Sequence, residues 1–198
     1  MKTETIIDIT QELFSCRVFP GDSSPKKEEL QRIAEGGSCN LTAFSMCAHN
    51  GTHVDAPFHF IENGKTIDEM GLIPYVGRCY VARHDGDVTG PDAQDILARA
   101  HEADADQRIL IAGNATVTAD AARAFAEAGI LLYGNESQTV GPIAAPAEVH
   151  RILLGANVTL LEGIVLTAVE EGVYFLSAAP LNLGGCDGAP CRAFLISL

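Results

Sequence analysis

Three histidines and one aspartate gather in a stretch of eleven residues in the first third of the sequence. The stretch reads HNGTHVDAPFH, and four of its side chains could bind a metal ion: His49, His53, Asp55 and His59. All four have odd numbers, and alternate side chains of an extended backbone share a face. Gly51 and Pro57 argue against an unbroken strand. We therefore expect the chain to bend here, with three imidazoles and one carboxylate turned to the same side.

Imidazole nitrogens and carboxylate oxygens are ligands for zinc, manganese and iron. A divalent ion lowers the pKa of water, which makes a nucleophile near neutral pH, and a nearby histidine can move the protons. The alternative is an inert, hydrogen-bonded polar loop. The concentration of ligand types favours a metal site, and the spacing does not separate zinc from manganese.

His150 and Glu162 form a second candidate pair downstream. His150 falls on a short predicted helix, and Glu162 directly follows the apolar run 158–161. An unpaired buried carboxylate is costly, so Glu162 needs a partner. That partner is a metal ion, an arginine or backbone amides. Taken alone, these two residues read as structural.

The elements that position these residues follow from hydrophobic patterning and turn residues. Strands are predicted over 6–9, 40–48, 77–83, 108–111, 130–133, 158–161, 174–178 and 192–196. Helices are predicted over 91–102, 118–128 and 146–154, with Thr118 as an N-cap and with Gly129 and Gly155 as stops. Residues 24–37 are polar and fit a short helix or a surface loop. The strand–helix–strand order of 108–161 predicts parallel pairing, and the strand-rich ends predict a mixed sheet.

Composition limits the class of protein. The 198 residues suffice for one domain with a core, and the net charge of −13 disfavours nucleic acid as a partner. The amino-terminal stretch lacks the apolar core of a signal peptide, and no apolar run is long enough for a transmembrane helix. Six cysteines without a CxxC pair predict reduced, mostly buried thiols in a cytoplasmic protein.

The metal-binding stretch resembles the HxGTHxDxPxH motif of the cyclase family, which includes bacterial kynurenine formamidases and isatin hydrolases. Seven fixed positions of that motif match: His49, Gly51, Thr52, His53, Asp55, Pro57 and His59. Residues 7–10 and 20–22 resemble the opening of family members. Residues 149–166 resemble their later His…Leu-Glu-Gly stretch, and residues 178–196 resemble their closing strands. The resemblance therefore covers nearly the whole chain.

This resemblance implies an α/β fold, a single domain over 1–198 with a twisted mixed β-sheet and flanking helices. It implies hydrolysis of an amide-type C–N bond, as in a formamide or lactam, in a small-molecule substrate. It also implies a homodimer or larger homo-oligomer and one or two divalent ions, Zn or Mn. No membrane partner is expected.

The resemblance also implies roles for individual residues. His49, His53 and Asp55 hold one metal ion, and Asp55 could bridge to a second. His150 and Glu162 complete that second site, so that in this light they are ligands and not structural residues. His59 is the proton shuttle.

One segment departs from the family pattern, GxDxxSxDP. Here residues 134–142 read GNESQTVGP, with Glu136 and Thr139 in place of the usual Asp and Ser, and Gly141 in place of an Asp. Glu136 and Thr139 are expected on the substrate side. The chain has no Trp, four Tyr and eight Phe, so no aromatic cage for an aryl substrate is evident.

Two alternatives to an amidohydrolase stay open at this point. One is a catalytically silent protein that binds a metal or a metabolite on the same scaffold, and the departure at Gly141 motivates it. The other is a metal-dependent lyase or dehydratase. The presence of His59 favours catalysis over silent binding.

Overall fold

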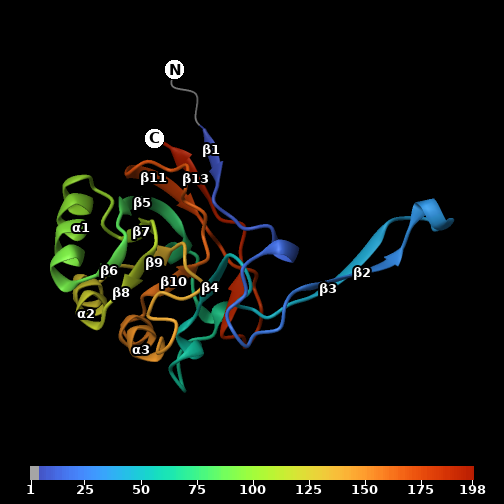
Figure 1. Cartoon of the computed structure of the whole chain (residues 1–198), viewed down its shortest axis with the longest axis horizontal. Helices are drawn as coiled ribbons and strands as arrows, with labels where there is room; N and C mark the ends of the chain where they lie inside the picture. Colours follow the sequence, from blue (N-terminus) through green and yellow to red (C-terminus); the bar gives the residue numbers. More distant parts are fainter. Residues whose placement is uncertain (1–4) are drawn as a thin grey trace.

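A large mixed sheet runs through the centre of the molecule (Figure 1). The computed structural model describes residues 5–198, so residues 1–4 of the predicted domain lie outside the described part. Within that part, nine strands form the sheet in the order β1-β13-β11-β5-β7-β9-β10-β4-β12. Their bounds are Ile6–Asp8 (β1), Phe194–Ser197 (β13), Gly172–Ser177 (β11), Val76–Arg83 (β5), Arg108–Ala112 (β7), Leu132–Asn135 (β9), Thr159–Glu162 (β10), His53–Asp55 (β4) and Gly188–Pro190 (β12).

The middle of the sheet is parallel and its two edges are antiparallel. β5, β7, β9 and β10 pair in parallel, as the strand–helix–strand order predicts. At one edge β10 pairs with β4 and β4 with β12, both antiparallel. At the other edge β5, β11, β13 and β1 are antiparallel neighbours. The expected α/β fold with a mixed sheet is therefore confirmed.

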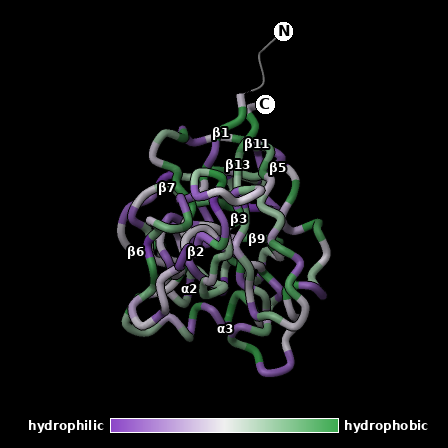
Figure 2. The backbone as a smooth tube through the Cα atoms, turned by 90° about the vertical axis from the view of Figure 1, so that its right-hand side faces the viewer, coloured by the Kyte–Doolittle hydropathy of each residue, from purple (hydrophilic) through white to green (hydrophobic). Residues whose placement is uncertain are grey.

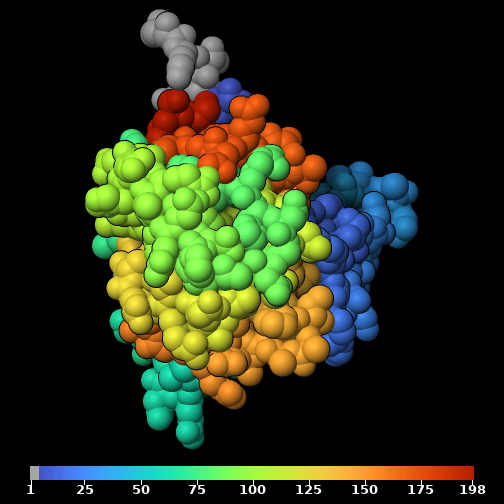
Figure 3. Space-filling view, turned by 60° about the vertical axis from the view of Figure 1, so that its left-hand side comes forward, coloured from blue at the N-terminus to red at the C-terminus, as the bar shows by residue number. Residues whose placement is uncertain are grey.

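Three helices cover one face of the sheet: α1 (Gly90–Glu102), α2 (Ala119–Ala128) and α3 (Ala147–Gly155). Figure 3 shows them stacked along one side of the molecule. A capping box between Thr89 and Asp92 starts α1, and Gly129 ends α2 in the left-handed region at a φ of 69°. Thr118 is the N-cap residue of α2, as predicted, but its hydroxyl makes no capping hydrogen bond and donates to the Val88 carbonyl.

Alternate residues of the central strands point into two separate cores. In β10, Leu160 packs among the helices, while Leu161 packs on the opposite face with Val54 of β4. Glu162 follows in register, so its side chain returns to the helix face. In β4 the same alternation turns His53 and Asp55 to the face that α3 covers. Val54, which lies between them in the sequence, points to the opposite face.

A long hairpin extends away from the body of the molecule (Figure 1). It consists of β2 (Lys26–Gln31) and β3 (Leu41–Ser45), which are antiparallel. Figure 2 views the molecule from the side on which this arm projects. The prediction of a helix or loop over 24–37 is therefore wrong for its central part. All six residues of β2 are exposed, so the strand has no buried face to give an alternating pattern.

Two further short strands form a pair outside the large sheet. β6 (Gly86–Val88) and β8 (Ala115–Val117) form a small parallel pair that the patterning did not predict.

All six cysteines are free, as expected. They are not mostly buried, however, because only Cys79 is buried and Cys39 is exposed. Among residues 5–198, the helices are all too short or too polar to cross a membrane.

Candidate metal centre and active site

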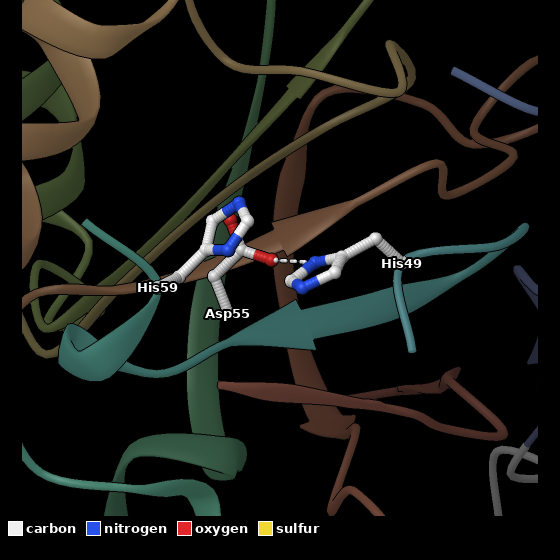
Figure 4. Close-up of side chains that lie close together, drawn as sticks. All are labelled: His49, Asp55 and His59. Carbon is white, nitrogen blue, oxygen red and sulfur yellow. Dashed lines mark hydrogen bonds and ion pairs between the residues drawn. The ribbon is translucent and has the colours of Figure 1, made fainter. Parts of the chain in front are cut away.

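The metal-binding stretch bends around the end of a short strand, as its glycine and proline predict. Gly51 turns the chain with a φ of 64° immediately before β4, and Pro57 begins a 3₁₀ turn over Pro57–His59 immediately after it. His49 comes from the loop before the strand, Asp55 from its end and His59 from the following turn (Figure 4). The bend brings side chains from three local structures to one point.

Asp55 lies at the centre of the site and is fully buried. Its Oδ1 atom is 2.8 Å from Nδ1 of His49 and 3.4 Å from Nε2 of His53. Its Oδ2 atom is 3.6 Å from Nε2 of His150. One carboxylate therefore faces three imidazoles from two parts of the chain.

His150 and Glu162 reach the same point from α3 and β10. The Nδ1–H of His150 donates to the Pro146 carbonyl at 2.8 Å, which turns Nε2 toward Glu162 Oε1 at 3.2 Å. Glu162 Oε2 lies 3.4 Å from Nε2 of His53. The five predicted ligands thus converge, although about a hundred residues separate the two halves.

The arrangement fits a divalent metal ion. The side chains form two groups, and within each group the ligand atoms all lie within 4.8 Å of one another. One group is His49, Asp55 and His59, the other is His53, Asp55 and Glu162, and Asp55 belongs to both. Nε2 of His53 and Oδ2 of Asp55 are buried without hydrogen-bond partners among the described residues. Buried polar atoms normally have partners, so these two atoms are placed as metal ligands would be.

The ionisable groups of the site interact strongly with one another. Burial opposes protonation of His49, but Asp55 and Asp187 outweigh it and raise the pKa of His49 to about 11. Burial likewise opposes ionisation of Asp55, while the imidazoles, His49 foremost, lower its pKa. An ion that enters this site must therefore compete with bound protons.

Two neighbouring cavities with shared lining residues lie at these residues and beside them. The inner cavity, about 220 Å³, is lined by the four imidazoles of the site and Glu162, together with Phe19, Phe60, Gln138 and Thr139. An outer cavity of about 780 Å³ shares Phe19, Gln138 and Thr139 with it. Their volumes suit a small molecule. Phe19 and Phe60 provide aromatic contacts at the site that the composition did not indicate.

The two residues expected on the substrate side differ in their surroundings. The Thr139 hydroxyl is buried without a partner among the described residues and lines both cavities. The carboxylate of Glu136 accepts the backbone N–H groups of Gly113 and Leu166, each at 2.8 Å. Gln138, which the sequence did not single out, lines both cavities, and its buried side-chain amide has no hydrogen-bond partner within residues 5–198.

Gly141 has a packing reason to replace the larger residue of the family pattern. A Cβ atom at this position would lie 3.1 Å from Cβ of Val149 and 3.3 Å from the Pro146 carbonyl oxygen. Both neighbours belong to the start of α3, which carries His150. Gly141 therefore allows the close approach of α3.

Sequence reasoning missed Asp187, which precedes β12. Its Oδ2 atom accepts hydrogen bonds from Nε2 of His49 at 2.8 Å and from Nδ1 of His59 at 3.0 Å. Hydrogen bonds from these two imidazoles lower the pKa of Asp187 below its ordinary value. Nothing in the local sequence pairs Asp187 with residues more than a hundred positions earlier. Only the pairing of β12 with β4 brings them together.

The sequence of the chain is similar to those of known proteins. Residues 7–142 match the family model described as "Putative cyclase". The chain belongs to the cyclase family. It is 33% identical to a kynurenine formamidase of Bacillus anthracis in an alignment of 210 positions that covers 98% of this chain and 99% of that protein. It is 31% identical to a kynurenine formamidase of Erythrobacter litoralis, over 98% and 94% of the two chains.

Two solved structures have the same fold as this chain. A structure described as a potential metal-dependent hydrolase with cyclase activity superposes with a TM-score of 0.80 at 27% identity, over 99% of both chains. Isatin hydrolase A from Labrenzia aggregata superposes with a TM-score of 0.80 at 22% identity, over 98% of this chain and 93% of that one. At this lower identity the likeness concerns the fold.

Proposed function

We propose that this cyclase-family protein is a metal-dependent hydrolase that cleaves an amide-type C–N bond, as in a formamide or lactam, in a small molecule. The observation that carries the proposal is the position of Asp55, which two groups of ligand atoms share beside a cavity. The kynurenine formamidase relatives support the reaction class. The substrate itself is left open.

The metal ligands we propose are His49, His53, Asp55, His150 and Glu162, holding one or two ions of zinc or manganese. The presence of Asp55 in both ligand groups supports a bridging role. A divalent ion in such a site polarises a carbonyl and lowers the pKa of water. The buried carboxylates and imidazoles keep the ion in place and exclude bulk solvent.

His59 is the residue we assign to proton transfer. Its Nδ1 is engaged by Asp187, so Nε2 is the nitrogen that can exchange a proton with the reactants. It stacks on His49, with ring centroids 4.0 Å apart, and it lines the inner cavity. In the hydrolysis an oxygen–carbon bond to water forms and the C–N bond breaks. His59 takes the proton from water and returns it to the departing nitrogen.

Thr139 is the substrate-side residue with the stronger support, because its hydroxyl is unpaired at the junction of the two cavities. Gln138 offers one further donor and acceptor at the same place. Glu136 lines the outer cavity, where Gly113 and Leu166 hold its carboxylate, and each of its oxygens keeps a further acceptor site for a substrate donor.

The test uses purified protein reconstituted with zinc or manganese and offered formyl amides, lactams and cyclic imides. We expect bound metal, turnover, and incorporation of labelled oxygen from water into the acid product. His53→Ala is expected to abolish both metal binding and turnover, while His101→Ala, which changes an exposed histidine, preserves them. Binding without turnover would favour the silent alternative, and product without labelled oxygen would favour a lyase.

We also propose that two or more copies of the chain assemble, through the β2–β3 hairpin. Four large apolar side chains on this arm are more than half exposed: Leu30, Ile33, Leu41 and Phe44. Several large apolar side chains exposed on one projecting arm favour an interaction site, and most soluble oligomers consist of identical chains. We also propose that this single hydrolase domain, residues 1–198, lies in the cytoplasm, because its six cysteines are all free and thiols stay reduced there.

Light scattering tests the assembly. We expect the wild type to have the mass of a dimer or larger oligomer, and Leu41→Ser with Phe44→Ser to lower it toward that of one chain. Leu72→Ser with Ile73→Ser removes exposed apolar surface elsewhere and serves as the matched control. A monomeric wild type, or an equal loss of mass in the control, contradicts the role of the hairpin.

A further inference from the structure

One oxygen atom of Asp187 holds two imidazole rings of the site. Oδ2 accepts from His49 at 2.8 Å and from His59 at 3.0 Å, and the two rings stack at an interplanar angle of 27°. We propose that Asp187 is a positioning residue that orients both rings at once, the metal ligand His49 and the proton-transfer residue His59. This inference rests on the proposed function and assigns a role to a residue outside the family motif.

The hydrogen bonds select which nitrogen of each ring carries the proton. A carboxylate oxygen only accepts, so His49 donates from Nε2 and His59 donates from Nδ1. Nδ1 of His49 faces the carboxylate of Asp55 in the same way, so an ion that binds there takes the place of the proton on Nδ1, while the N–H at Nε2 keeps its bond to Asp187. His59 presents Nε2 for proton exchange. Metal-ligating histidines commonly donate their second N–H to a carboxylate, which fixes the tautomer and the ring orientation.

Asp187 is itself fixed by the backbone around it. Its carbonyl oxygen accepts the N–H of Ala56 at 2.9 Å, directly beside Asp55. The next residue, Gly188, pairs with Asp55 in the antiparallel register of β12 and β4. The carboxylate therefore has a set position relative to the metal ligands. This is what an orienting residue requires.

Two competing roles for Asp187 can be separated from positioning. Oδ2 of Asp187 already accepts hydrogen bonds from both rings, and the side chain is 41% exposed, whereas those of Asp55 and Glu162 are buried, which argues against a direct ligand. A purely structural role in the loop before β12 is tested through Asp68. Asp68 holds the same loop from its other side, because its Oδ1 accepts the N–H of Gly185 at 2.9 Å. Asp68→Asn is therefore the matched control.

The experiment compares the wild type with Asp187→Ala, Asp187→Asn and Asp68→Asn. Zinc affinity, measured by competition with a chromophoric chelator, is expected to fall about 10- to 100-fold in Asp187→Ala. At saturating zinc, kcat on a formyl amide is expected to fall about 100-fold or more, with KM changed less than about threefold. Asp187→Asn, which retains an acceptor oxygen, is expected to lie between Asp187→Ala and the wild type.

A readout independent of metal and turnover is the tautomer of His59 in long-range ¹H–¹⁵N spectra. We expect Nδ1–H in the wild type and in Asp68→Asn, and Nε2–H as the main form in Asp187→Ala. Wild-type affinity, kcat and tautomer in Asp187→Ala would overturn the inference, as would equal losses in Asp68→Asn. If the wild type binds zinc but cleaves no amide, the proposed reaction fails while affinity and tautomer still decide the role of Asp187.

Discussion

His53 and Glu162 face each other across the antiparallel pairing of β4 and β10, with Nε2 of the histidine 3.4 Å from Oε2 of the glutamate. Both side chains are buried. A shift of one residue in this register would turn each side chain to the opposite face of the sheet. The strand pairing therefore joins the two halves of the metal site.

Replacing Glu162 by glutamine tests the contribution of its charge. Glu162→Gln keeps the shape and an acceptor for the N–H of Val140, but removes the negative charge beside His53 and His150. We expect bound metal to fall sharply and kcat to fall at least about 100-fold. Metal content after dialysis and the rate of amide hydrolysis measure both effects. Glu148→Gln, on the exposed side of α3, is the control, and unchanged metal content in Glu162→Gln would contradict the assignment.

Gly188 leaves room for the ring of His49. A Cβ atom there would lie 2.7 Å from Cε1 of His49 and 2.8 Å from the Val54 carbonyl oxygen. We expect Gly188→Ala to reduce the free energy of unfolding by about 1–3 kcal/mol and to weaken zinc binding, because the ring must move. Denaturant unfolding and chelator competition measure the two changes. At Gly184, in the same loop, a Cβ would meet only Asp68 at 4.0 Å, so equal effects of Gly184→Ala would refute this explanation.

The sequence predicted the three helices and the central strands because their patterns are local. Gly129 marks the end of α2, and the runs in β7 and β10 are apolar because the strands are buried. The strand β2 could not be found this way. Its residues, KKEELQ, are all exposed and are held only by pairing with β3.

The candidate site also has one part that the sequence predicted and another part that it did not. His49, His53, Asp55 and His59 lie close in sequence, so their spacing was informative before any fold was known. His150 and Glu162 gained a role only through the family resemblance, and the structure brings them beside Asp55. Asp187 was missed because its contacts depend on β12 lying next to β4, which three residues of sequence do not reveal.

Glu171 provides a pH-dependent test of stability away from the metal site. Burial works against its ionisation, but hydrogen bonds from Tyr80 and the backbone of Arg83, with the guanidinium of Arg99, lower the pKa of Glu171. A lowered pKa in the folded state contributes stability that is present above the ordinary pKa of 4.5 and is lost as the pH falls through the folded value.

Glu171→Gln should therefore destabilise the protein at neutral pH, by about 1 kcal/mol or less because the side chain is partly exposed. The difference from the wild type should shrink as the pH falls below the ordinary pKa. Urea unfolding of both proteins at pH values on either side of that pKa measures this change. Glu127→Gln alters an exposed residue of α2 for comparison. A difference that grows toward acid pH contradicts the sign of the shift.

The most direct test of the central claim is the initial rate of formyl-amide hydrolysis plotted against divalent metal bound per chain. Metal-free protein prepared with a chelator is titrated with zinc or manganese, and bound metal is measured in the same samples. We expect almost no turnover without metal, a rate that rises with occupancy and a plateau at one or two ions per chain. Hydrolysis at full rate in metal-free protein, or full occupancy without hydrolysis of any amide in the panel, would contradict the account.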